Sequence, residues 1–230
     1  MPLVPTLFIT QYVLDVTLGS FIKTNKKGFD IMLGSYEIHV VPGKLPQKVA
    51  SAFTEIFGNM VGAEYSVIAY LGSKVVSGVN HAILATQTMI TGNDVHNVVL
   101  IVLNEKDDKF SLVEITNVLS DSGLMGGVQI NPTTDIPEEA MKVLEDNLAG
   151  FVGSNVSVFA LVGTQVVNGV KYIFAGETEM VLSPEAMTKG NPNRVVLISV
   201  YSNYDKIEFK EILEGVPQQG LLGKPLGEWP

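Results

Sequence analysis

The chain of 230 residues contains no cysteine. This absence excludes disulfide bonds, thiolate chemistry and cysteine-ligated metal sites. Charged residues are also scarce, at 17% of the chain, whereas apolar residues make up 46%. Such a composition is typical of ordered globular domains and argues against a largely disordered chain.

Basic residues are fewer than acidic ones: the chain has 15 Lys and Arg and 24 Asp and Glu. The net charge of −9 argues against a nucleic-acid backbone or an anionic membrane as a partner. No uninterrupted apolar run reaches the roughly 18 residues needed to span a bilayer. Residues 1–10 also lack the basic start of a secretory signal. We therefore expect a soluble, cytoplasmic protein.

Motifs for catalysis and metal binding are missing as well. His39, His81 and His96 do not have the spacing of metal ligands, and we expect His81 to fill a half-buried strand position. The chain has neither a Gly-x-Ser-x-Gly elbow nor a phosphate-binding Gly-x-x-x-x-Gly-Lys loop. Glu177 and Glu179 share a predicted strand face, but no apolar enclosure for an acid pair is evident. We expect no enzyme, no cofactor and no metal.

The chain contains an internal repeat. Residues 72–79 read Gly-Ser-Lys-Val-Val-Ser-Gly-Val, and 91 positions later residues 163–170 read Gly-Thr-Gln-Val-Val-Asn-Gly-Val. Further downstream the spacing becomes 97, and the six extra residues fall within 183–193, which has the composition of a loop. A register broken once, inside a loop, indicates two copies of one fold. It predicts two domains, at 1–123 and 124–230.

Each unit opens with a helical pattern. Apolar residues recur at helical spacing from Val49 to Met60, and again from Ala140 to Phe151. A first-turn proline, a capping residue and a glycine exit are typical of helix ends. They are Pro46 and Gly62 in the first unit, and Asp135, Pro137 and Gly153 in the second.

After each helix the apolar period changes to two, which predicts strands. A strand before each helix is expected within 34–41 and 127–131, and extra N-terminal strands from Leu7 to Leu18 and from Gly28 to Val41. The later strands are predicted at 64–76, 79–91, 97–104 and 109–119, and at 155–167, 170–182, 194–202 and 206–214. The fold class is therefore α+β, with one helix packed on an antiparallel sheet in each domain. The tail from Gly215 to Pro230 is rich in Gly and Pro and has no periodicity, so we expect it to be loosely ordered.

The second unit carries the most specific motif. It reads Gln165-Val166-Val167-Asn168-Gly169, followed by Val170-Lys171-Tyr172, and Gly126-Gly127 precede its helix. These features resemble the cystatin superfamily, in particular its cysteine-free stefins, which carry a Gln-Val-Val-x-Gly hairpin and a trunk glycine. The first unit shares the resemblance mainly through the repeat. It implies two cystatin-like domains, each with a curved antiparallel sheet.

The resemblance also implies inhibition of papain-type cysteine proteases. In cystatins an N-terminal trunk and two hairpins form a wedge that enters the protease cleft. Protease binding is thereby assigned to Gly126, Gly127, Gln165, Val166, Val167, Asn168, Gly169 and Tyr204. The second hairpin departs from the family, because Ser202-Asn203-Tyr204-Asp205-Lys206 contains neither Pro-Trp nor Leu-Pro. A weaker equivalent in the first unit is Lys74, Val75, Val76, Ser77 and Gly78, where lysine replaces the glutamine.

Val-Val-x-Gly-Val is also a good β-hairpin in its own right. Two hypotheses therefore stand side by side. The first is an inhibitor that acts through the hairpin tip of the second domain. The second is a non-inhibitory assembly or interaction module, in which N-terminal strands pair with another chain and form a homo-oligomer. The partner is a protein in both cases.

Overall fold

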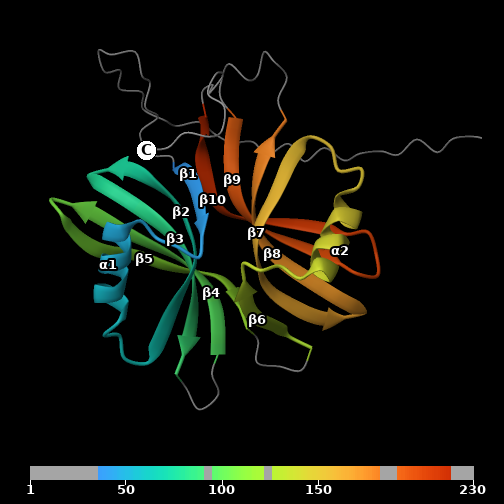
Figure 1. Ribbon diagram of the computed structural model, residues 1–230, viewed down its shortest axis with the longest axis horizontal. Coiled ribbons are helices and arrows are strands. Elements are labelled where there is room, and N and C mark those ends of the chain that lie inside the picture. Colours follow the sequence, from blue (N-terminus) through green and yellow to red (C-terminus); the bar gives the residue numbers. More distant parts are fainter. Residues whose placement is uncertain (1–35, 91–94, 122–125, 182–190, 219–230) are drawn as a thin grey trace, which may run out of the picture. The chain divides into compact units, whose positions relative to one another are not determined.

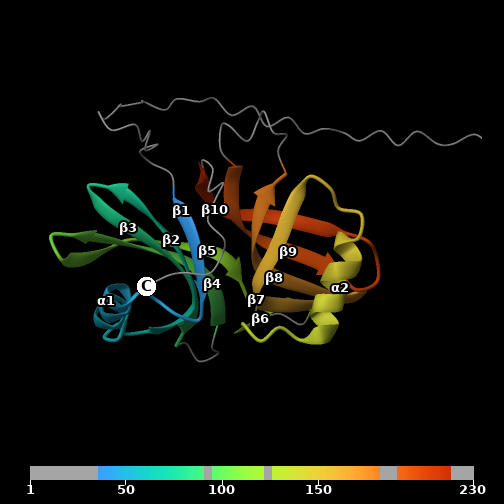
Figure 2. The same ribbon diagram turned by 45° about the horizontal axis from the view of Figure 1, so that its top comes forward.

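The computed structural model describes residues 36–90, 95–121, 126–181 and 191–218. These residues form two five-stranded antiparallel sheets, each with one helix, so the predicted α+β class is confirmed. Figures 1 and 2 show each helix lying across one face of its own sheet. The extra N-terminal strands predicted before residue 36 and the end of the tail lie outside the described residues. The prediction of a loosely ordered tail from Gly215 is wrong at its start, because the last strand pairs as far as Gln218. Neither helix in the described ranges is long and apolar enough to cross a membrane.

The first half contains a strand, a helix and a four-strand meander. The sheet order is β1-β2-β3-β4-β5, so neighbours in sequence are neighbours in space. The elements are β1 (Glu37–Pro42), α1 (Gln47–Phe57), β2 (Ala63–Val76), β3 (Gly78–Met89), β4 (Val95–Lys106) and β5 (Lys109–Ser120).

The second half repeats this arrangement. Its sheet order is β10-β9-β8-β7-β6, and its first four elements have the bounds of their first-half counterparts displaced by 91 residues. The pairing of β2 with β3 and that of β7 with β8 also shift register at matching places. The elements are β6 (Val128–Thr133), α2 (Glu138–Leu148), β7 (Ser154–Val167), β8 (Gly169–Met180), β9 (Asn191–Tyr201) and β10 (Ile207–Gln218).

The helices are shorter than their apolar patterns. Pro46 and Pro137 are the N-cap residues, and no side chain caps either helix, so the cap predicted at Asp135 is wrong. Instead, the backbone N–H of Asp135 donates to Thr133 Oγ1 over 3.0 Å, which holds it in the preceding turn. The predicted glycine exits are also wrong, because the caps are Gly58 and Ala149. The positive-φ residues Gly62 and Gly153 lie in the connections beyond them, and so do the exposed Met60 and Phe151.

Each helix covers a core on its own sheet. Under α1, Val49, Phe53 and Phe57 pack on residues of β2, β3 and β4. Under α2, Ala140 and Leu144 pack on β7, β8 and β9. The apolar helical stripes therefore do what their spacing predicts: each one buries one face of a sheet.

The faces of the sheets turned away from the helices are buried as well. One further cluster draws from both halves and includes Leu71, Leu84 and Val98 together with Val162, Ile173, Val195 and Leu197. Each half is thus more than the two-layer unit that a single helical stripe predicts. Strand β4 shows why, because Val98 and Val99 point to opposite faces and both are buried. A near-continuous apolar strand is the expected sequence of a sheet covered on both sides.

Candidate functional site

The β7–β8 hairpin presents an apolar tip. Val167 pairs with Gly169, which leaves Asn168 alone in the turn, and Gly169 has φ +100°. A residue with a side chain rarely adopts this conformation, so the glycine permits the narrow turn. The side chains behind the turn are open to solvent: Val166 is 68% exposed and Val167 37% exposed. Apolar side chains this exposed contribute little to the packing of the core.

The loop between β9 and β10 is joined to this tip. The backbone N–H of Ser202 donates to the carbonyl oxygen of Val170, and the N–H of Val170 donates to Ser202 Oγ, each over 2.9 Å. A Cβ on Gly169 would lie 2.6 Å from the side chain of Asn203, so this loop packs directly against the turn. The two hairpins therefore form one surface.

Tyr204 stands on this second loop. Its ring stacks on Tyr201, with 4.7 Å between centroids, and its side chain is 43% exposed. The ammonium groups of Lys171 and Lys206 lie 5.4 and 5.3 Å from the Tyr201 ring. The Tyr201 hydroxyl donates to Glu208 Oε2 over 3.2 Å. The hydrogen bond from Lys206 lowers the pKa of the Glu208 carboxyl. These charges surround Tyr201, and the stack holds the Tyr204 ring against it.

Gly126, the predicted trunk glycine, is joined to the hairpin through Gln165. Gln165 Nε2 donates to the carbonyl oxygen of Gly126 over 3.0 Å. Strand β6 begins at Val128, which pairs with Gln165 itself. Gly126 has φ +80° and is exposed, while Gly127 is half-buried. Residues 122–125, which lead into this point, lie outside the described residues. We call Gly126, residues 165–170 and residues 202–206 together the second-half edge.

The predicted residues therefore come together in one place, and two supporting residues were missed. Ser202 provides the link between the hairpins. Asn147 on α2 reaches the second loop, because its Nδ2 donates to Tyr201 O over 3.3 Å and its Oδ1 accepts from the N–H of Lys206 over 3.0 Å. A signal for Asn147 was present, since it occupies the place of Ile56 in the otherwise apolar helical stripe.

The corresponding first-half edge, formed by residues 74–79 and 105–109, is more charged. Its tip also exposes two valines, Val75 at 57% and Val76 at 41%. Its second turn is built from Asp107 and Asp108, both at positive φ, and Lys106 Nζ donates to Ser77 Oγ over 3.2 Å. Lys74, in the place of Gln165, lies with its ammonium 4.8 Å from the Tyr36 ring centroid.

A chain of polar side chains runs inward from this edge. His81 is more buried than predicted, at 8% exposure, and its Nδ1 lies 3.0 Å from the hydroxyl of Tyr70. Its Nε2 lies 3.2 Å from Glu105 Oε2. Both ring nitrogens therefore have polar partners, as a buried imidazole requires. At the repeat-related positions the second half has Leu161, Tyr172 and Ser202. The fold itself therefore does not require the hydrogen-bonded series of Tyr70, His81 and Glu105.

Outside these edges, Glu177 lies half-buried on β8. Its burial raises the pKa of the carboxyl, His39 lowers it, and Glu179 raises it. Among the described residues, no three His, Asp or Glu side chains gather as a metal site would require. No protein-family model, no curated protein and no solved structure matches the chain.

Proposed function

We propose that this protein is a tandem cystatin-like binder of papain-type cysteine proteases, acting through the second-half edge. The observation that carries the proposal is the hydrogen bond from Gln165 Nε2 to Gly126 O. It joins the trunk position to the first hairpin, while Ser202 joins that hairpin to the second. Three segments that are distant in sequence thus share one edge, as a wedge requires.

The chemistry of the tip suits an apolar, solvent-excluding cleft. Val166 and Val167 offer exposed apolar area on a rigid two-stranded support, so binding them orders few groups that are not already ordered. The turn at Gly169 is tight, not extended, and a tight turn does not present a cleavable peptide to a protease. Tyr204 adds an aromatic ring where the cystatin family places Pro-Trp or Leu-Pro, and aromatic rings are frequent anchors of interfaces.

The two edges differ in ways that favour the second half. At the first-half edge Lys106 is hydrogen-bonded to the tip, and Asp107 and Asp108 follow it in the turn; these charges lose hydration on entering a cleft. At the second-half edge the position of Asp107 is taken by Tyr204. We propose that one protease binds per chain.

The test is an inhibition titration of papain with matched variants. Val166→Asp places a charge at the tip and weakens inhibition by about a hundredfold, because the cleft must bury that charge. Val75→Asp makes the same change at the repeat-related, similarly exposed position and leaves inhibition unchanged. Absence of inhibition by the unmodified protein at micromolar concentration removes the proposal, and equal losses in both variants remove its assignment to the second half.

A second proposal, assembly through an open strand edge, rests on β5. This strand is at the edge of its sheet, and Leu112 and Val113 on it are 37% and 53% exposed. On the edge strand β10 the position of Val113 is taken by Lys210, whose ammonium donates to the carbonyl oxygen of Val118 on β5. Light scattering tests it: a mass well above 24.8 kDa that falls to the monomer value in Val113→Lys supports assembly, and a monomeric unmodified protein excludes it.

A further inference from the structure

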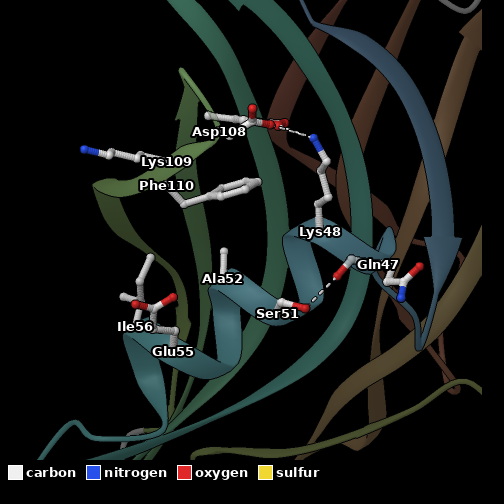
Figure 3. Close-up of a pocket in the computed structure, with 10 residues that line it drawn as sticks. Gln47, Lys48, Ser51, Ala52, Glu55, Ile56, Asp108, Lys109 and Phe110 are labelled. Carbon is white, nitrogen blue, oxygen red and sulfur yellow. Dashed lines mark hydrogen bonds and ion pairs between the residues drawn. The ribbon is translucent and has the colours of Figure 1, made fainter.

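The first half has an open pocket of about 710 Å³ between α1 and the β4–β5 turn. Its apolar lining consists of Ala52, Ile56 and Phe110. Figure 3 shows the Phe110 ring extending toward the helix, while the side chain of Lys109 extends away from it. The pocket is therefore lined by apolar side chains together with charged ones, which include Lys48, Glu55 and Asp108.

The side chains differ at the repeat-related place in the second half. There Asn147 replaces Ile56 and ties α2 to the β9–β10 loop through Tyr201 O and the N–H of Lys206. Isoleucine cannot form these bonds. Ile207 replaces Phe110, and Ser202 replaces Glu105. Because both halves share one fold, the side chains of Ile56, Phe110 and Glu105 are particular to the first half, whereas Asp146 and Asp205 keep an acidic group at the positions of Glu55 and Asp108.

Lys48 has carboxylate partners in the pocket, but one of the pocket's carboxylates has no basic partner in the part of the chain that the structure describes. Lys48 is held between Asp108, at 2.9 Å, and Glu105, at 3.4 Å. These hydrogen bonds raise the pKa of the Lys48 ammonium. Two carboxylates therefore already lie beside this ammonium, which makes it a poor receptor for an anion. Glu55 also lines the pocket, and it has no ion pair among the described residues. One carboxylate is thus left for a cation.

The position of Glu55 along the helix favours the same ligand charge. Glu55 lies near the C-terminal end of α1, where the helix dipole stabilises positive charge. It is seven residues after Lys48, or about 10 Å along the helix axis. A ligand lying along α1 would keep its positive end away from the Lys48 ammonium and rest its apolar body on Ile56 and Phe110.

We propose that this pocket binds an organic cation with an apolar body, either a free alkyl amine or guanidinium or the basic side chain of a peptide. Glu55 pairs with the charge, and Phe110 contacts the alkyl chain and attracts the cation with its ring face. This site is separate from the proposed protease-binding edge and does not depend on it.

The test is an NMR titration of the full chain with butylguanidinium, observing the backbone amides of residues 51–56 and 105–110. The proposal predicts saturable shifts at these amides and at least several-fold weaker binding of the neutral isostere butylurea. Glu55→Gln weakens butylguanidinium binding by about fivefold, the upper range for an exposed ion pair. Asp146→Asn, the matching change in α2, leaves it unchanged. Equal binding of butylurea, or equal effects of the two variants, overturns the proposal.

A second variant tests the shape of the pocket. Ile56→Asn introduces the residue that ties α2 to its loop in the second half and replaces part of the apolar lining by an amide. We expect it to abolish the shifts while the protein keeps its circular dichroism spectrum. Unchanged binding by this folded variant contradicts the assigned location. The source of the cation is tested with the peptide acetyl-Gly-Arg-Gly-amide. Tighter binding than butylguanidinium supports a basic side chain of a partner as the ligand, and equal or weaker binding supports a free small cation.

Discussion

Gly215 on β10 lies directly against Ile38 on β1. A Cβ on Gly215 would come within 2.7 Å of Ile38 Cδ1 and 2.8 Å of Asn193 O, closer than real Cβ atoms approach other atoms. A backbone bridge between Tyr36 and Gly215 accompanies this contact. The absence of a side chain at Gly215 is therefore what allows the edge strands of the two sheets to meet here.

Gly215→Ala should destabilise the protein by about 1–3 kcal/mol, because the added methyl group overpacks this contact. The free energy of unfolding, measured by urea denaturation, tests this. Ile38→Val removes Cδ1, so the double variant should recover part of the loss despite the contact with Asn193 O. Strict additivity of the two changes in a double-mutant cycle would show that Gly215 and Ile38 do not press on one another.

Asn147 should act as a brace for the second loop. Asn147→Ile, which copies Ile56, removes both bonds to the loop and leaves the N–H of Lys206 without its acceptor. We expect amide exchange at Lys206 to accelerate about tenfold, and inhibition of papain to weaken by a similar factor because the loop is no longer preorganised. Asn147→Asp keeps the acceptor and should restore slow exchange at Lys206. Exchange that is equally slow in all three proteins contradicts the bracing role.

The carboxyl of Glu177 should make stability fall as the pH rises. Burial raises its folded-state pKa above the ordinary value of 4.5, so the folded state holds a proton that the unfolded state releases first. The free energy of unfolding should therefore decrease from about pH 4.5 up to the raised pKa and then level off with respect to this group. Glu177→Gln should flatten this part of the profile and stabilise the protein at pH 7. Glu64→Gln, at an exposed position on β2, is the control, and a profile identical in both variants contradicts the assignment.

Periodicity and turn chemistry predicted most of the fold. The alternation around Ser77-Gly78 and Asn168-Gly169 placed two hairpins within a few residues of their observed bounds, because a strand pattern and a glycine turn are local signals. The helix ends were harder. Phe151 continues the apolar spacing of α2, yet the chain leaves the helix at Ala149. Spacing alone does not show where a helix must end so that the next strand can pair.

The sequence predicted least well which residues are buried by partners distant along the chain. Val98 and Val99 are both buried because both faces of the sheet are covered, and a single strand does not say what covers it. The candidate site shows the same limit. The motif identified Gln165 and Gly169, but the contacts of Gly126, Asn147 and Ser202 with the hairpins arise only when segments up to 59 residues apart are brought together.

The most direct test of the central claim is hydrogen–deuterium exchange of the protein alone and mixed with papain whose active-site cysteine is blocked by a small group. The account predicts slower exchange at residues 165–170 and 202–206 in the mixture, with residues 74–79 and 105–109 unchanged. Protection confined to the first-half segments, or no protection anywhere at papain concentrations of tens of micromolar, would contradict it.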